Sequence, residues 1–191
     1  LTALPLFVWM GEILFRTKLS ENLFKGLSPW MQKLPGGLIH VNIVGCALFA
    51  AISGSSAATV ATVGKMSIPE LRKRNYPEKI LLGSLAGSGT LGLLIPPSII
   101  LIIYGVAVQE SIAKLFIAGI VPGIMIALIF MSYVIVWSLI NKKKMPKISE
   151  KYSFLEKIKR SKQLLPVIIL ISGVIGSIYT GVATATEAAS L

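Results

Sequence analysis

The sequence is short of the residues that build covalent cross-links and metal sites. Among 191 residues there are one cysteine, one histidine and eight acidic residues. Cys46 alone excludes a disulfide within the chain. His40 and Cys46 have no partners at the spacing of zinc ligands. We therefore interpret His40 as a polar residue near one end of an apolar segment rather than as a ligand or a proton relay.

Long polar stretches are scarce, and apolar residues dominate instead. The chain is 54% hydrophobic, and its mean hydropathy of +0.78 exceeds that of a soluble domain. These runs predict an all-α integral membrane protein that crosses a lipid bilayer several times. Because the chain lacks an initiator methionine and begins and ends within apolar runs, we expect it to be a fragment of a longer polypeptide.

The net charge of +11 would suit a nucleic-acid partner, but the distribution of the charges argues against that class. Eighteen of the 19 Lys and Arg residues fall in segments 16–33, 65–79 and 142–162, between apolar runs. The positive-inside rule places these three basic segments in the cytoplasm. Both ends of residues 34–64 are then cytoplasmic, so this segment is predicted to enter the membrane and return as a re-entrant hairpin.

The same rule predicts the rest of the topology. We expect a first span at residues 1–15, a broken span that runs outward at 80–108 and a returning span at 115–140. A basic amphipathic cytoplasmic connection at 142–163 then leads to a further outward span at 164–180. Residues 184–191 begin the next helix, because Thr184 and Glu187 have the spacing of a capping box.

Two of the apolar segments are interrupted in the middle by helix-breaking residues. The first contains Ser53-Gly-Ser-Ser56 and the second contains Ile95-Pro-Pro-Ser98. A break at membrane depth leaves backbone N–H and C=O groups that lipid cannot satisfy, so it persists only where protein or a polar ligand supplies partners. Two such breaks indicate the substrate and ion site of a transporter. Structural kinks with satisfied backbones are the alternative.

Neither interrupted segment contains Asp or Glu, so a cation bound at the breaks would be held by hydroxyl and carbonyl oxygens. A monovalent cation suits such a site, and the predicted ligands are the hydroxyls of Ser53 and Ser56 and the carbonyls of Gly92, Ile95 and Pro97. Half-helices that begin after each break point their positive ends into the same region and favour an anionic substrate group. The residues expected beside that substrate are Ser55, Thr90 and Ser98.

Other patterns carry less weight. Gly87-Ser-Gly-Thr-Leu-Gly92 matches the dinucleotide pattern G-x-G-x-x-G, but it lies in a membrane segment without the preceding strand that such a site needs. A soluble nucleotide enzyme is therefore not expected. Gly83-x-x-x-Gly87 and Gly119-x-x-x-Gly123 allow close packing of helices in lipid. The alternative function is a channel or pore-forming subunit, which would need a continuous polar pathway.

Short motifs along nearly the whole chain resemble those of one known family, in matching order. They are Pro5-Leu-Phe7 with Gly11, Leu48-Phe-Ala-Ala-Ile-Ser-Gly-Ser-Ser56, Leu91-Gly-Leu-Leu-Ile-Pro-Pro-Ser98, Tyr104-Gly105, Ser111-Ile112, Leu115-Phe-Ile-Ala-Gly119, Pro122-Gly123 and Thr184-Ala-Thr-Glu-Ala-Ala189. The chain thus resembles the large, DctM-like membrane subunit of tripartite ATP-independent periplasmic (TRAP) transporters. Ala185 stands where the family usually has proline.

The resemblance implies a sodium-driven elevator carrier of the bacterial inner membrane, built from inverted repeats. This chain would hold the first hairpin and the first broken helix, with sodium bound at the predicted cation ligands. The resemblance also implies a small membrane subunit and a periplasmic solute-binding protein that delivers the substrate. Family substrates are mostly organic acids such as C4-dicarboxylates and sialic acid. Neither enzyme activity nor a cofactor other than the coupling ion is implied.

Overall fold

All regular structure in the described part of the chain is helical. The computed structural model describes residues 19–146 and 152–184, together with positions 5, 6, 9, 13, 17 and 187. Its elements are α2 (Leu19–Met31), α3 (Ile39–Ser53), α4 (Ser56–Lys73), α5 (Glu78–Gly89), η1 (Thr90–Leu93), α6 (Ile99–Val108), α7 (Ile112–Ile140), η2 (Lys142–Lys144), α8 (Phe154–Ser161), η3 (Lys162–Leu164) and α9 (Leu165–Tyr179). The expected all-α class is confirmed, while the predicted span 1–15 falls almost wholly outside the described residues.

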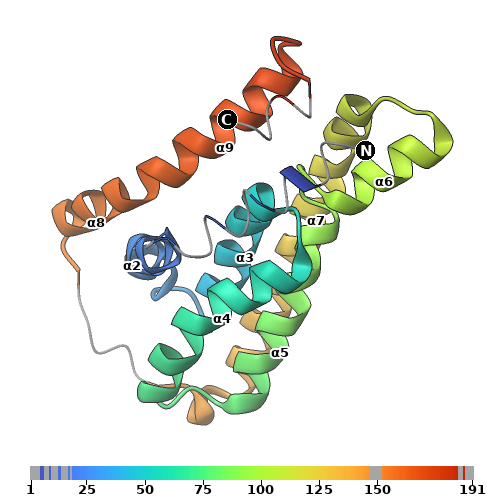
Figure 1. Cartoon of the computed structure of the whole chain (residues 1–191). Helices are drawn as coiled ribbons and strands as arrows, with labels where there is room; N and C mark the ends of the chain where they lie inside the picture. Colours follow the sequence, from blue (N-terminus) through green and yellow to red (C-terminus); the bar gives the residue numbers. More distant parts are fainter. Residues whose placement is uncertain are drawn as a thin grey trace.

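Helices α3 and α4 form a helical hairpin at the centre of the molecule (Figure 1). The chain reverses at Gly54, whose φ of 60° lies in the left-handed region that glycine adopts without strain. The ends of the hairpin also meet, because the Leu38 N–H donates to the Tyr76 hydroxyl at 3.0 Å. Buried Cys46, Phe49 and Val63 belong to the apolar core that holds the two helices together.

The three basic segments contain helix, which the charges did not predict for segments 16–33 and 65–79. Segment 16–33 contains α2, segment 65–79 begins within α4, and segment 142–162 contains α8. Leu23 and Leu27 recur four residues apart on α2 and are buried in the core, which is the pattern of an amphipathic helix.

The second interrupted segment consists of α5, a short 3-10 helix η1, an irregular stretch and α6. The regular α-helix ends at Gly89, so the departure from α-helix begins earlier than the predicted break at residues 95–98. Pro96 and Pro97 lack the N–H groups that would continue the helix, and the bond between them is cis. The chain turns here before α6 begins at Ile99.

Two helices of the described residues are long and apolar enough to cross a membrane. They are α7, with 29 residues, and the continuous run α8–η3–α9 over Phe154–Tyr179, with 26 residues. In Figure 1 the second of these lies along the upper left, above α2. Beyond it, the hydrogen bonds of a capping box link Thr184 and Glu187, as the sequence predicts; the Thr184 N–H, for example, donates to Glu187 Oε2 at 2.7 Å.

Candidate functional site

The tip of the α3–α4 hairpin docks against the break between η1 and α6. The Ile99 N–H donates to the Gly54 carbonyl at 3.2 Å, across 45 residues of sequence. A Cβ built on Gly54 would lie 2.7 Å from the Pro97 carbonyl oxygen, and one built on Gly92 would lie 2.9 Å from the Ser56 nitrogen. Side chains at these two glycines would therefore collide with backbone. The structure thus joins the two breaks that the sequence singles out.

Buried hydroxyl groups hold the hairpin tip in shape. The hydroxyls of Ser53 and Thr59 lie 3.0 Å apart, and Thr59 also donates to the Ser55 carbonyl at 2.7 Å. The Ser55 side chain accepts from the Ala58 N–H at 3.4 Å, which caps the first turn of α4. The sequence analysis missed Thr59, although its spacing of four residues from Ser55 is the signal for such a bond.

The break diverts the hydrogen bonds that an uninterrupted helix would make. Pro96 has no N–H to offer the Gly92 carbonyl, and the Ile99 N–H, which would reach the Ile95 carbonyl, donates to Gly54 instead. The Leu93 carbonyl accepts from the Ser98 hydroxyl at 2.8 Å. The carbonyls of Gly92 and Ile95 thus lose their regular helical donors, and carbonyl oxygens are ligands that hard cations prefer.

Helix α7 supports the other side of the break through its small residues. A Cβ on Gly119 would lie 2.7 Å from the Leu94 carbonyl oxygen, and one on Gly123 would lie 2.8 Å from Ile95 Cγ1. This small-residue pattern therefore packs closely, as predicted. In the other pattern, Gly87 faces the Phe130 ring at 3.6 Å, but nothing described lies within 4 Å of a Cβ on Gly83.

Most of the predicted site residues lie where the hairpin tip meets the helix break, while Thr90 lies on the surface. The tip of the hairpin and the break bring together the residues Ser53, Ser55, Ser56, Gly92, Pro97 and Ser98. Ile95 lies in the break and packs toward α7. Thr90 is exposed, and its hydroxyl donates to the Gly87 carbonyl at 2.6 Å. Ser98 is fully buried, and its hydroxyl bonds within the break.

One further polar residue fixes the hairpin against the broken helix. Asn42 is fully buried in α3, and its amide donates to the Ser84 hydroxyl at 3.0 Å and to the Leu81 carbonyl at 3.3 Å. Ser88 donates to the Asn42 carbonyl at 3.4 Å. Asn42 could have been found in the sequence as a single amide in an otherwise apolar helix. A polar group at such a position raises the free energy of the folded state unless it has hydrogen-bond partners.

The remaining chemical candidates have structural explanations. His40 is fully buried at the start of α3, with Nε2 2.7 Å from the Pro35 carbonyl oxygen. No group of three His, Cys, Asp or Glu residues that could hold a metal ion occurs among the described residues. The glycine-rich stretch 87–92 lies at the end of α5 and in η1 rather than after a strand, so it lacks the setting of a dinucleotide site.

Comparison with known proteins identifies the family. The family described as "Tripartite ATP-independent periplasmic transporter, DctM component" matches residues 1–191. The chain is 37% identical over 191 residues to the C4-dicarboxylate TRAP transporter large permease protein DctM of Pseudomonas aeruginosa, covering 100% of this chain and 44% of that protein. The sialic acid TRAP transporter large permease protein SiaM of Vibrio cholerae is 37% identical over 199 residues, with 100% and 44% covered.

A third relative is the ectoine TRAP transporter large permease protein TeaC of Halomonas elongata, 35% identical over 195 residues, again with 100% of this chain and 44% of that protein covered. The chain therefore spans less than half the length of these relatives. The family consists of transporter components, which confirms that the chain is not an enzyme. From the match over its full length and from these identities, the chain belongs to the DctM family of TRAP transporter membrane components.

Proposed function

We propose that this chain is part of a sodium-coupled uptake carrier for a carboxylate solute in the bacterial inner membrane. The carrier works with a small membrane subunit and receives its substrate from a periplasmic binding protein. The relatives named above are assigned to C4-dicarboxylates, sialic acid and ectoine, and all three solutes carry a carboxylate. The site of this chain therefore has to recognise a carboxylate group.

The docking of the hairpin tip into the helix break carries this proposal. Helices α4 and α6 both begin at this junction, so their positive ends point toward it and favour an anionic group. The carbonyls of Gly92 and Ile95, which lose their helical donors, offer oxygen ligands beside those helix ends. A sodium ion there, completed by Ser53 and Ser56 hydroxyls and the Pro97 carbonyl, would neutralise part of the substrate charge.

The length of α3 supports a re-entrant hairpin. Its 15 residues rise about 22 Å, which is less than the roughly 30 Å of hydrocarbon in a bilayer. The hydrogen bond between Leu38 and Tyr76 keeps the two ends of the hairpin together. A helix that is too short to cross, and whose partner returns to its starting point, fits a hairpin that opens to the cytoplasm. Its movement with the broken helix would be the elevator step.

The test is uptake by the complete transporter, reconstituted with its small subunit and binding protein. Ser56→Ala should weaken the sodium dependence of uptake. Ser55→Ala should raise the apparent substrate constant about tenfold or more, since a hydrogen bond to a charged group contributes about 1.5–3 kcal/mol. Ser132→Ala, on the exposed side of α7, is the matched control.

Each alternative has a distinct outcome. Equal uptake in a proton gradient without sodium would refute sodium coupling, and conductance without the binding protein would identify a channel. If each of the three single variants Ser55→Ala, Thr90→Ala and Ser98→Ala showed wild-type uptake, the substrate would bind away from this junction.

A further inference from the structure

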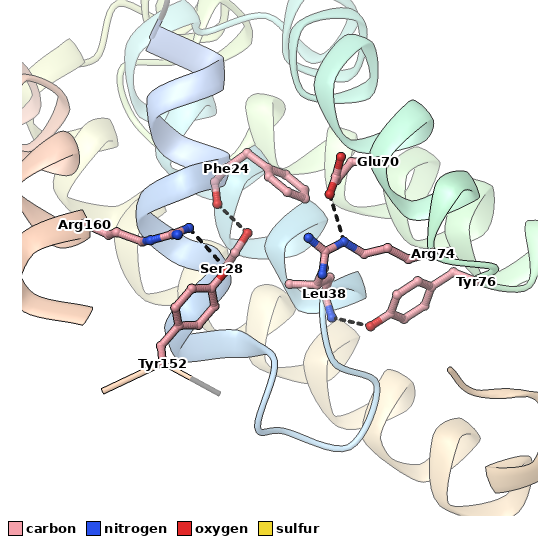
Figure 2. A network of polar contacts seen from close by, with 8 residues as sticks. All are labelled: Phe24, Ser28, Leu38, Glu70, Arg74, Tyr76, Tyr152 and Arg160. Carbon is pink, nitrogen blue, oxygen red and sulfur yellow. Dashed lines mark hydrogen bonds and ion pairs between the residues drawn. The ribbon is translucent and has the colours of Figure 1, made fainter. Parts of the chain in front are cut away.

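The three basic segments meet at one cavity, although they are far apart in the sequence. The cavity has a volume of about 630 Å³ and lies between α2, the C-terminal half of α4 and the chain from Tyr152 to Arg160. Glu21 and Lys25 line it from the first segment, Lys65 and Arg74 from the second, and Arg160 from the third. Figure 2 shows this region, with Tyr152 and Arg160 beside α2 and the Glu70–Arg74 pair at the C-terminal end of α4.

The charge around the cavity favours an anion. Four cations, Lys25, Lys65, Arg74 and Arg160, line it with two carboxylates, Glu21 and Glu70, which leaves two positive charges in excess. Glu21 pairs with Lys25, and Glu70 pairs with Arg74, whose Nε lies 2.8 Å from Glu70 Oε1. The net positive charge of the lining attracts an external anion rather than a metal ion.

Arg160 is oriented in a way that suits a phosphate group. Its Nη1 donates to the Tyr152 hydroxyl at 3.2 Å, and its guanidinium carbon lies 4.3 Å from the centre of the Tyr152 ring. These two contacts limit the motion of the side chain, so less entropy is lost when its other N–H groups bind a ligand. A planar guanidinium matches phosphate oxygens two at a time.

The neighbouring helix α8 is the basic end of the run α8–η3–α9, which is long enough to cross a membrane, and it carries exposed apolar side chains. Phe154, Leu155 and Ile158 are 66%, 77% and 44% exposed. On its other side Lys157 is buried, with Nζ 5.3 Å from the centre of the Trp30 ring on α2. Basic side chains near the end of a membrane-spanning helix extend to the boundary between the acyl chains and the headgroups. The cavity beside it therefore lies at the depth of lipid headgroups.

We propose that this cavity binds the phosphodiester headgroup of an anionic phospholipid from the cytoplasmic leaflet. Arg160 and Lys65 contact the phosphate, while the apolar carbons of Phe24, Met66 and Pro69 at the cavity wall accommodate the glycerol end of the lipid. The bound lipid links α2 and α8 to the returning arm of the hairpin. The proposal needs the cytoplasmic placement of the basic segments, but it does not depend on the sodium and substrate site.

The test is native mass spectrometry of the complete transporter in detergent, titrated with phosphatidylglycerol, with phosphatidylcholine or with inorganic phosphate. The cavity variant is Lys65→Gln with Arg160→Gln. The matched control is Lys73→Gln with Lys159→Gln, which removes two exposed charges from the same helices without touching the cavity. Each lost cation should weaken phosphatidylglycerol binding about fivefold, so we expect roughly a twenty-fivefold higher Kd for the double cavity variant.

The outcomes decide between sources of the anion. Weaker phosphatidylglycerol binding in the cavity variant alone would support the proposal, and Arg160→Lys should lose part of the binding, because an ammonium does not match two phosphate oxygens at once. Equal binding of phosphatidylcholine, or an equal loss in the control variant, would overturn it. Tight binding of inorganic phosphate that excludes the lipid would show that the site takes a soluble anion. Loss of phosphatidylglycerol binding with unchanged sodium-dependent uptake would leave the proposed function standing.

Discussion

The hairpin tip gives a prediction that separates backbone strain from steric contact. Gly54 combines a φ of 60° with a Cβ position 2.7 Å from the Pro97 carbonyl oxygen. Alanine in the left-handed region costs about 1–2 kcal/mol, and forcing a methyl group against a fixed backbone oxygen costs roughly 1–3 kcal/mol. We therefore expect Gly54→Ala to lower the free energy of unfolding by about 2–5 kcal/mol.

Three other glycines provide matched controls. Gly181 has a φ of 72° but nothing described within 4 Å of its Cβ position, so Gly181→Ala carries only the backbone cost. Gly92 has no left-handed φ, but its Cβ would lie 2.9 Å from the Ser56 nitrogen, so Gly92→Ala carries only the steric cost. Gly83 has neither feature, and Gly83→Ala should stabilise α5 by up to about 1 kcal/mol.

The assay is thermal unfolding of the complete transporter in detergent, followed by sodium-driven uptake after reconstitution. The melting temperature should be highest for Gly83→Ala, intermediate for Gly181→Ala and Gly92→Ala, and lowest for Gly54→Ala. Uptake should fall in the two variants at the junction and survive in Gly181→Ala. If Gly54→Ala melted together with Gly181→Ala, the tip of the hairpin would not press on the Pro97 carbonyl, and the docking argument would fail.

Two further predictions concern the topology and the break. In a cysteine-free background, Lys33→Cys and Lys73→Cys should both be shielded from an impermeant reagent added outside, and Gln109→Cys should react. Labelling of only one of the first two would mean that the α3–α4 segment crosses the membrane. Ser98→Ala should lower the free energy of unfolding by about 0.5–1.5 kcal/mol, because the hydroxyl bonds a carbonyl inside the break. Exposed Ser132→Ala is the control, and equal melting temperatures would contradict a structural role of the Ser98 hydroxyl.

The two helix breaks could be predicted because their causes are local. Gly54 supplies the left-handed residue that a sharp reversal requires. Pro96 and Pro97 remove two N–H donors, and this loss does not depend on the tertiary structure. The family resemblance rests on the same stretches. The basic segments were harder to predict, because their charges suggested loops. Leu23 and Leu27 show why this was wrong for α2: burial of one face outweighs a high charge on the other.

The composition of the candidate site could be predicted more fully than its geometry. Ser53, Ser55 and Ser56 lie at the hairpin tip, as their sequence spacing requires. Thr90 begins the 3-10 helix η1 and its side chain is exposed, so its place beside a substrate stays a prediction that the sequence spacing does not fix. A 3-10 turn has fewer residues per turn than an α-helix, so it rotates every later side chain about the helix axis. Spacing along the sequence then no longer predicts which face of the helix a residue lies on.

The sequence by itself determined the chemical class of this protein. Its apolar runs are typical of a membrane protein, its basic residues predict the orientation of those runs, and its glycines and prolines predict where helices break. Only the tertiary structure decided what those breaks meet. The bond from Ile99 to Gly54 and the convergence of three basic segments on one cavity join residues far apart in the chain. Such contacts depend on how whole helices pack, which no local pattern of residues specifies.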